Sequence, residues 1–362
     1  MSEIFGSDWT RRDLLRRVGD ASQLAGIRRA TLLDGRERGV KVFEFRTGGG
    51  LNFTVVPSRG MDIANAEFRG TPLAWISPSG LTAPDFFDPN DALRSFSGGL
   101  LTTCGMMNVG PGGEDEGEDL PFHGRVSNIP AHQVTADARW ERDRLTLTTQ
   151  GIVRETSASG YTLELTRNIS SVAGSRKIRI SDIVENIGFR DAPFMFLYHI
   201  NAGFPVVDEG SELVLAAQNA EPRDAVAEAG LADRLRFSAP GADFEEQVFY
   251  HDTVADENRH VWAAVINKRH NDGEGVGLYV RYHKTQFPNF IEWKMMGEGT
   301  YVVGMEPANC RVEGRAAERA ADTLESIEVG GRRHFETEIG VLVGQEEIAE
   351  FEERVASVRS NS

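Results

Sequence analysis

Apolar and polar positions alternate along most of the chain in short runs, and turn residues separate one run from the next. In the segment 145–150, for example, Leu145, Leu147 and Thr149 share one face. Period-two alternation of this kind is typical of a strand with one buried face. The runs that we predict as strands are 40–46, 51–56, 61–68, 145–150, 161–169, 177–184, 211–216, 260–267, 277–282, 300–304 and 335–343. The crossover helices that a parallel sheet needs are not indicated between these runs, so the pattern predicts an all-β sandwich or barrel of antiparallel sheets.

Helical patterns occur at the two ends of the chain. Ser7-Asp8, followed by Trp9 and Leu14, predicts a short capped amphipathic helix. The stretch 345–358 carries apolar residues along one side and predicts a closing helix. No change in composition marks a linker, so we predict one large domain. Its boundaries are an N-terminal helical extension at 1–27, a β domain at 28–344 and a C-terminal helix and tail at 345–362.

The overall charge limits the kinds of partner. The 362 residues are 40% hydrophobic and 26% charged, which is typical of a soluble globular protein, and the formal net charge is −16. Nucleic acid and anionic membranes need a basic surface, so we expect neither as the main partner, although a locally basic pocket remains possible. No apolar run has the length of a signal peptide or of a bilayer span. The oligomeric state stays open between monomer and homodimer.

Cysteine is sparse. Cys104 and Cys310 are too few for a disulfide framework and lack the spacing of a zinc site. Both lie in apolar, glycine-containing surroundings, where a buried free thiol behaves as a small hydrophobic group. We therefore expect two buried free thiols and a cytoplasmic, reducing compartment.

One segment has low complexity. Residues 110–119 read Gly-Pro-Gly-Gly-Glu-Asp-Glu-Gly-Glu-Asp. A stretch so rich in acid and glycine predicts a mobile surface loop that does not pack. A flap over a site is the alternative, because the segment leads directly to His123. A calcium site is less favoured, since the required ligand spacing is missing.

Three separate segments each offer one group suited to moving protons. His123 is followed by a glycine, which lets a ligand approach the imidazole, and His199 ends a strongly apolar strand at 193–198. Glu306 follows another buried-looking run and is restricted to extended conformations by Pro307. A carboxylate is rarely buried without a partner or a function. Two imidazoles and one carboxylate are suited to acid–base chemistry on a hydroxyl.

These segments carry a resemblance to a known family. Phe122-His123-Gly124-Arg125, Leu197-Tyr198-His199-Ile200-Asn201 and Gly304-Met305-Glu306-Pro307 resemble, in order, the three signature regions of the aldose 1-epimerase (galactose mutarotase-like) superfamily. The similarity extends from about 51 to 343. The segments 58–62, 99–108 and 306–309 resemble most the branch described as "aldose 1-epimerase family protein".

The resemblance implies a fold and a reaction. The fold would be a galactose mutarotase-like β-supersandwich with a sugar in a cleft on one concave face. Glu306 would match the base that takes the anomeric hydroxyl proton, His199 the acid that protonates the ring oxygen, and His123 an imidazole bound near that oxygen. Rotation about C1–C2 and ring closure would then interconvert the anomers, so the reaction needs no cofactor.

Further residues are candidates for binding the sugar. The family's second signature usually continues differently from Ile200-Asn201 here, and its sugar-binding aspartate has only Asp252 as a candidate counterpart. Trp293 could stack on a pyranose. The complete set of predicted substrate-binding residues is Arg59, Asp62, Arg125, Asn201, Asp252, Arg281, Trp293, Lys294 and Asn309. The basic members of this set suggest a sugar that bears an acidic group.

Two other functions stay open at this point. The protein could bind or sense a sugar without catalysis, because fold does not fix function. His123, His199 and Glu306 could instead form a metal triad of a sugar isomerase or oxygenase, although no local ligand spacing supports a metal.

Overall fold

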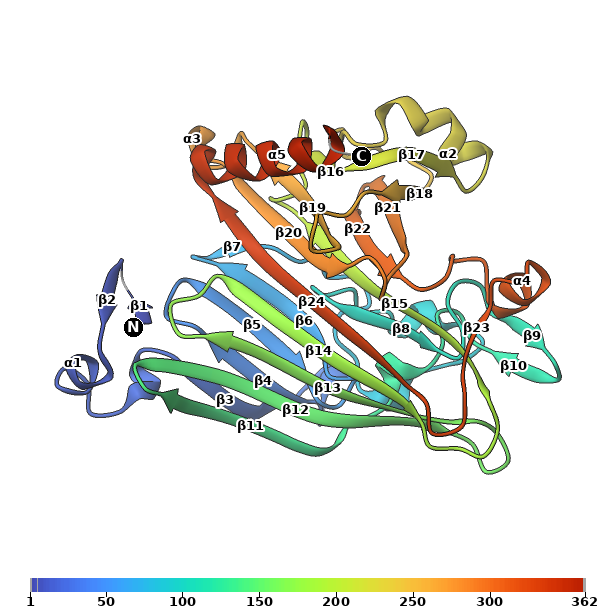
Figure 1. The fold of residues 1–362 in the computed structure, drawn as a ribbon, viewed down its shortest axis with the longest axis horizontal. Helices are drawn as coiled ribbons and strands as arrows, with labels where there is room; N and C mark the ends of the chain where they lie inside the picture. Colours follow the sequence, from blue (N-terminus) through green and yellow to red (C-terminus); the bar gives the residue numbers. More distant parts are fainter. Residues whose placement is uncertain (1, 5, 361–362) are drawn as a thin grey trace.

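In the computed structural model, which describes residues 2–4 and 6–360, three large antiparallel sheets make up most of the molecule (Figure 1). The first sheet contains β3 (Gly26–Thr31), β4 (Lys41–Arg46), β5 (Leu51–Val56), β6 (Asp62–Phe68) and β7 (Thr71–Pro72) in that order. The second contains, in spatial order, β11 (His132–Glu141), β12 (Arg144–Thr156), β13 (Thr162–Val172), β14 (Lys177–Asn186), β24 (Arg332–Val343), β20 (Val276–His283), β19 (His260–Asn267) and β16 (Glu212–Leu215). The all-β prediction is confirmed.

The third sheet positions the candidate site. Its order is β17 (Ala217–Pro222), β18 (Gln247–Thr253), β21 (Asn289–Gly297), β22 (Thr300–Ala308), β15 (Ala192–Gly203) and β23 (Glu325–Ile327), and β8 (Thr102–Met106) also pairs with β15. All of β15 is buried, as its apolar sequence requires. One face of this sheet joins the main hydrophobic core, which fills the space between the sheets.

Helices and small hairpins complete the chain. The helices are α1 (Arg11–Leu15), α2 (Ala225–Gly230), α3 (His270–Gly273), α4 (Arg315–Ala320) and α5 (Gly344–Ser360). Single 3₁₀ turns occur at Ala21–Gln23, Gly35–Glu37, Pro84–Phe86, Ala92–Ser95, Val126–Asn128 and Leu231–Asp233. The two-stranded hairpins are β1 (Ser2–Ile4) with β2 (Ser7–Trp9), and β9 (Gly113–Asp115) with β10 (Glu118–Leu120). No helix within residues 2–4 and 6–360 is both long and apolar enough to cross a membrane.

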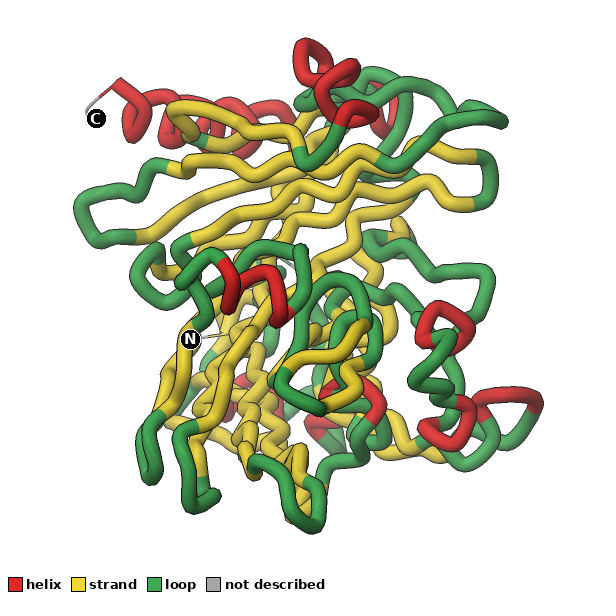
Figure 2. The backbone as a smooth tube through the Cα atoms, turned by 90° about the vertical axis from the view of Figure 1, so that its right-hand side faces the viewer, coloured by secondary structure: helices red, strands yellow, loops and turns green. Residues whose placement is uncertain are grey.

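The closing helix is confirmed. Helix α5 lies along one end of the molecule in Figures 1 and 2. Its buried residues Ile348, Phe351 and Val355 pack on a small cluster that includes Ala264 and Tyr279 from the second sheet. This spacing of three and four residues is the apolar stripe expected of a helix on a sheet.

The N-terminal helix is shorter than expected and begins later. Ser7–Trp9 pairs as β2, so the predicted cap at Ser7-Asp8 is wrong. The side chain of Thr10 caps α1 instead and accepts the backbone N–H of Asp13 over 3.2 Å. Competition from the hairpin removes the first predicted turn, and α1 keeps only five residues.

The prediction that the acidic segment does not pack is wrong. It forms the β9–β10 hairpin, and Asp115 is 6% exposed. Arg315 Nε donates to Asp115 Oδ2 over 2.6 Å, and Arg319 Nε donates to Asp115 Oδ1 over 2.8 Å. These bonds, Arg319 first, hold the pKa of the Asp115 carboxyl below its usual value. The arginines come from α4, about 200 positions away, so local composition could not reveal them.

Candidate functional site

The third sheet places His199 and Glu306 opposite each other. Ile200 on β15 pairs with Met305 on β22, so the preceding histidine and the following glutamate lie side by side on one face. His199 Nε2 is 3.1 Å from Glu306 Oε1, and both side chains are buried. Each residue lies inside its strand, whereas the sequence indicated positions after the strand ends. Pro307 is accommodated in β22 although it has no N–H to donate to the ladder.

His123 reaches the same region from a turn after β10. Its backbone has a φ of 56°, and the φ of Gly124 is 75°. A Cβ on Gly124 would lie 2.1 Å from the carbonyl oxygen of Gly105, so only glycine fits there. The imidazole of His123 has its ring centre 5.9 Å from that of His199. The three predicted acid–base groups therefore converge.

They line one cavity with a volume of about 680 Å³. Aromatic side chains dominate its inner walls: the ring of Trp293 lies 5.3 Å from that of His199, and Phe96 lies at the same distance from His199. The lining residues are Trp75, Ser77, Pro78, Ser79, Leu93, Phe96, Gly110, Pro111, Phe122, His123, His199, Arg223, Glu246, Val248, Trp293, Thr300, Glu306, Val312 and Glu313. A mostly apolar cavity with a few convergent polar groups is the usual form of a small-molecule site.

The hydrogen bonds of His123 define its tautomer. Its Nδ1 accepts the backbone N–H of Gly110 over 3.1 Å, so the ring proton is on Nε2. Burial, with a smaller contribution from His199, lowers the pKa of His123 to about 3. At neutral pH this imidazole is uncharged and can donate one hydrogen bond through Nε2.

Burial keeps both members of the His199–Glu306 pair neutral at rest. It raises the pKa of Glu306 well above its usual value, and the charge of Glu246 adds to the rise. It lowers the pKa of His199 to about 4, which a hydrogen bond from Asn201 and the charge of Glu246 partly offset. Within the described chain, His199 Nδ1 and Glu306 Oε1 are buried without a hydrogen-bond partner. Leaving such groups unpaired costs about 1–3 kcal/mol each, which a polar ligand would recover.

Glu246, Trp75 and Phe96 are lining residues that the sequence did not indicate. Glu246 Oε2 accepts the indole N–H of Trp293 over 2.9 Å, and its Oε1 accepts Arg223 Nη2 over 2.9 Å. These bonds hold the indole against His199. An exposed glutamate in an acidic protein gives no signal in one sequence.

Two of the predicted sugar-binding residues hold the first sheet and its loops instead of lining the cavity. Arg59 is 4% exposed and donates to carbonyl oxygens of Thr82, Ser95 and Ser127. Asp62 is paired with the fully buried Arg167 over 2.9 Å. Their donors and acceptors are occupied within the protein, so we assign them to the scaffold.

The two predicted asparagines also bond to backbone. Asn201 donates to the carbonyl oxygens of Gly99 and His199, each over 3.0 Å. Asn309 accepts the Phe196 N–H over 2.6 Å. Both fix β15, which carries His199, so their contribution to the site is through the position of that strand.

The remaining predicted residues lie outside the cavity lining. Arg125 donates to the Asp119 carbonyl oxygen over 2.7 Å, and Lys294 donates to the carbonyl oxygens of Asp233 and Arg236, each over 2.8 Å. Arg281 lies 3.5 Å from Glu338. Asp252 is exposed on β18. Of the nine predicted binding residues, Trp293 lines the cavity.

This placement removes the reason to expect an acidic sugar. In the cavity lining, as far as the chain is described, Arg223 is the cation, and it is paired with Asp224 and Glu246. Glu246, Glu306 and Glu313 bring three carboxyl groups to the same lining. In residues 2–4 and 6–360, no group of three His, Cys, Asp or Glu side chains is arranged to hold a metal ion.

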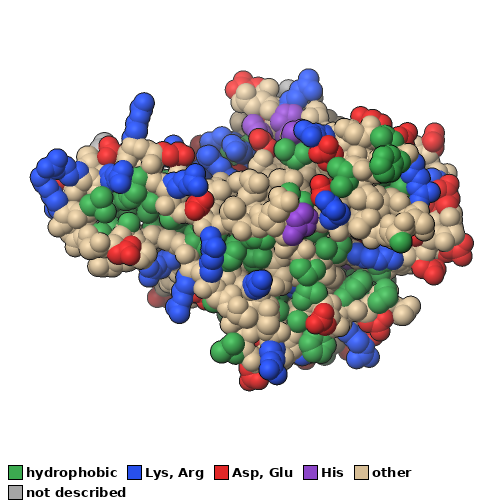
Figure 3. All heavy atoms as spheres, turned by 90° about the horizontal axis from the view of Figure 1, so that it is seen from below, with side chains coloured by type: hydrophobic (Ala, Val, Ile, Leu, Met, Phe, Trp, Pro, Cys, Tyr) green, Lys and Arg blue, Asp and Glu red, His purple; other side chains and the backbone are tan. Residues whose placement is uncertain are grey.

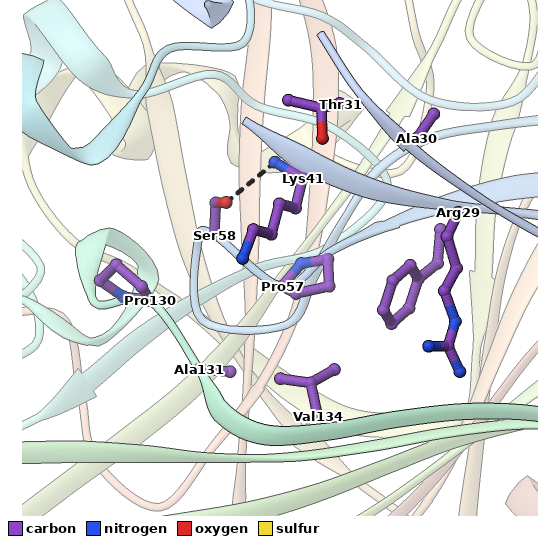
Figure 4. Close-up of a pocket in the computed structure, with 10 residues that line it drawn as sticks. Arg29, Ala30, Thr31, Lys41, Pro57, Ser58, Pro130, Ala131 and Val134 are labelled. Atoms are coloured by element: carbon purple, nitrogen blue, oxygen red, sulfur yellow. Dashed lines mark hydrogen bonds between the residues drawn. The ribbon is translucent and has the colours of Figure 1, made fainter. Parts of the chain in front are cut away.

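A second hollow of about 490 Å³ lies between β3, β4 and the start of β11 (Figure 4). Arg29, Lys41, Phe43 and Val134 are among the residues that line it, and Ser58 Oγ accepts the Lys41 N–H over 2.9 Å. It brings no histidine or carboxylate to its lining, so we do not connect it with acid–base chemistry.

Solved structures show which class of protein has this fold. A structure from Klebsiella pneumoniae subsp. pneumoniae MGH 78578, named "putative aldose 1-epimerase", superimposes with a TM-score of 0.87 at 24% identity, covering 94% of this chain and 90% of that one. A galactose mutarotase-like protein from Clostridium acetobutylicum gives a TM-score of 0.59 at 11% identity, with 88% and 99% covered. A galactose 1-epimerase from Lactobacillus acidophilus NCFM gives 0.55 at 12% identity, with 89% and 100% covered. The chain has the galactose mutarotase-like fold, as the sequence resemblance predicted.

The family itself is defined by sequence. Residues 37–341 match the family model described as "Domain of unknown function (DUF4432)". The chain belongs to this family. Among curated proteins, no match to the chain is found.

Proposed function

We propose that the protein is a carbohydrate mutarotase or closely related epimerase that interconverts the anomers of a reducing sugar. The observation that carries this proposal is the buried contact of 3.1 Å between His199 Nε2 and Glu306 Oε1, in a cavity that also receives His123. Ring opening needs a proton removed from O1 while another is delivered to O5. An adjacent carboxyl and imidazole supply that pair of groups.

The proton inventory of the pair matches the two halves of the reaction. When Glu306 is ionised and His199 is protonated, the carboxylate takes the O1 proton, the C1–O5 bond breaks with its electrons going to O5, and the imidazolium protonates O5. This leaves both groups neutral, which is the state that burial favours. After rotation about C1–C2, Glu306 returns its proton to O1 as O5 attacks C1 and gives its proton to His199.

His123 has a separate part in this scheme. Its Nε2–H donates a hydrogen bond to the ring oxygen, while its Nδ1 is occupied by the Gly110 N–H. Because its pKa is about 3, it stays neutral and takes no proton itself. The aromatic face of Trp293 offers a surface on which a pyranose can stack. No cofactor takes part.

The test is the variant Glu306→Gln, which keeps the shape of the side chain and removes its charge. We expect anomer interconversion, followed by saturation-transfer NMR or polarimetry, to fall by about 10²–10⁴-fold. Glu257→Gln changes an exposed loop carboxylate in the same way and serves as the control.

Three results contradict the assigned roles or the activity. Unchanged interconversion in Glu306→Gln, with the fold intact, refutes the role of the carboxylate. Tight sugar binding by calorimetry, with wild-type interconversion no faster than buffer, assigns the cavity to carbohydrate binding without catalysis. Stoichiometric metal in the purified protein, required for activity, favours the metal triad.

A further inference from the structure

An arginine-rich hollow lies at the N-terminal end of the molecule. Its volume is about 610 Å³, and its lining consists of Arg11, Arg12, Leu15, Arg16, Arg142 and Asp143. It shares no residue with the lining of the cavity at His199. Figure 3 shows Lys and Arg side chains gathered at the left end of the molecule, where α1 lies in Figure 1.

Two segments far apart in the sequence build this hollow and are joined by direct contacts. Helix α1 contributes Arg11, whose backbone N–H donates to Asp143 Oδ1 over 2.9 Å. Asp143 lies in the turn between β11 and β12. The guanidinium of Arg11 also lies 5.6 Å from the centre of the Trp140 ring on β11. The positions of the arginines are therefore set by tertiary structure.

Three of these arginines lack partners. The side chains of Arg12, Arg16 and Arg142 make no hydrogen bond or ion pair within the part of the chain that the structure describes. Carboxylates are abundant in this protein, with 55 Asp and Glu against 39 Lys and Arg. An excess of acid favours pairing every arginine, yet this hollow concentrates several around one carboxylate.

Arginines elsewhere on the same sheet show the contrast. Arg139 is paired with Asp137 over 2.9 Å, Arg154 with Glu164 over 2.5 Å, and Arg332 with Glu185 over 3.0 Å. Arg142, in addition, has a φ of 58°, a backbone conformation that favours glycine or asparagine. A turn chosen for stability alone would not place an unpaired arginine there.

We propose that this hollow binds a phosphate-type oxyanion carrying more than one negative charge. Gathered guanidinium groups repel one another until an anion joins them, and their planar donor forks match the oxygens of phosphate. The net charge of −16 repels an extended polyanion at long range, so a compact phosphate group fits better than nucleic acid. Free phosphate compounds and lipid headgroups offer this chemistry equally.

The test uses pyrophosphate and two kinds of vesicle as probes. Binding of pyrophosphate to the full-length protein is measured by calorimetry at low ionic strength. Co-sedimentation is measured with vesicles of phosphatidylcholine alone and of phosphatidylcholine with phosphatidylglycerol. The variant is Arg12→Gln with Arg16→Gln and Arg142→Gln. The control, Arg139→Gln with Arg154→Gln and Arg332→Gln, removes the same charge from paired arginines.

We expect the hollow variant to lose at least tenfold in affinity and the control to keep the wild-type value. Pyrophosphate binding that is lost in the hollow variant supports a site for a soluble phosphate compound. Co-sedimentation only with phosphatidylglycerol, lost in the same variant, supports the site with a headgroup as the source. Absence of binding to every probe, or equal loss in the two variants, overturns the proposal. Sugar interconversion is measured separately and does not bear on it.

Discussion

The hairpin that leads to His123 depends on one buried carboxylate, and Asp115→Asn tests this. Arg315, 1% exposed, and Arg319 both converge on Asp115, so the substitution leaves a buried guanidinium without its main counter-charge. Breaking a buried pair in this way costs about 3–5 kcal/mol. Glu118 remains 2.9 Å from Arg315, so we expect the lower end, about 3 kcal/mol.

The assay for this variant is urea unfolding, with the midpoint and slope compared with those of the wild type. Asp119→Asn is a matched control, because it is exposed on the same hairpin. We expect Asp115→Asn to lower the midpoint at constant slope and Asp119→Asn to change stability by less than about 0.5 kcal/mol. Equal effects of the two variants would refute the inference that buried pairing orders this segment. Since the folded pKa of Asp115 is lowered, its contribution is present above its unfolded pKa and is lost as the pH falls through the lower folded value.

Three further predictions concern the cavity. Glu246→Gln keeps an acceptor for the Trp293 indole but removes a charge that raises the pKa of Glu306, so the acidic limb of the pH–rate profile should move to lower pH; an unshifted limb contradicts this. His123 should show the Nε2–H tautomer by ¹⁵N NMR without titrating between about pH 5 and 8; because the unfolded chain protonates this group near pH 6.5 and the folded protein does not, stability should rise with pH in that range, by less in His123→Gln. Neutral reducing sugars should interconvert faster than uronic or phosphorylated ones, since Arg223 is already paired; faster turnover of the acidic sugars would refute this.

Period-two alternation was enough to predict the sheets, because one buried face is a local property of a strand. The motifs around His199 and Glu306 were found for a related reason: a polar residue in an otherwise apolar strand stands out. Their exact contact was not predictable, since it depends on the register of β15 against β22.

The errors have a common physical origin in long-range pairing. Arg59 and Asp62 attracted a binding role because they are charged residues in a turn, but Asp62 is neutralised by Arg167, more than 100 positions away. The acidic hairpin was misjudged for the same reason, since its arginines lie on α4. Glu246 was missed because its function depends on the position of Trp293, which no local pattern encodes.

His199 and Glu306 stand on adjacent interior strands, whereas much of the surrounding wall comes from connecting segments such as 75–96 and 110–122. The reacting groups and the surfaces that select a ligand are thus carried by different parts of the chain. Connecting segments tolerate insertion and exchange far better than interior strands do. Grafting new connections onto this framework should therefore change which molecule is accepted while leaving the proton-transfer groups in place, which makes the family a modular starting point for engineering.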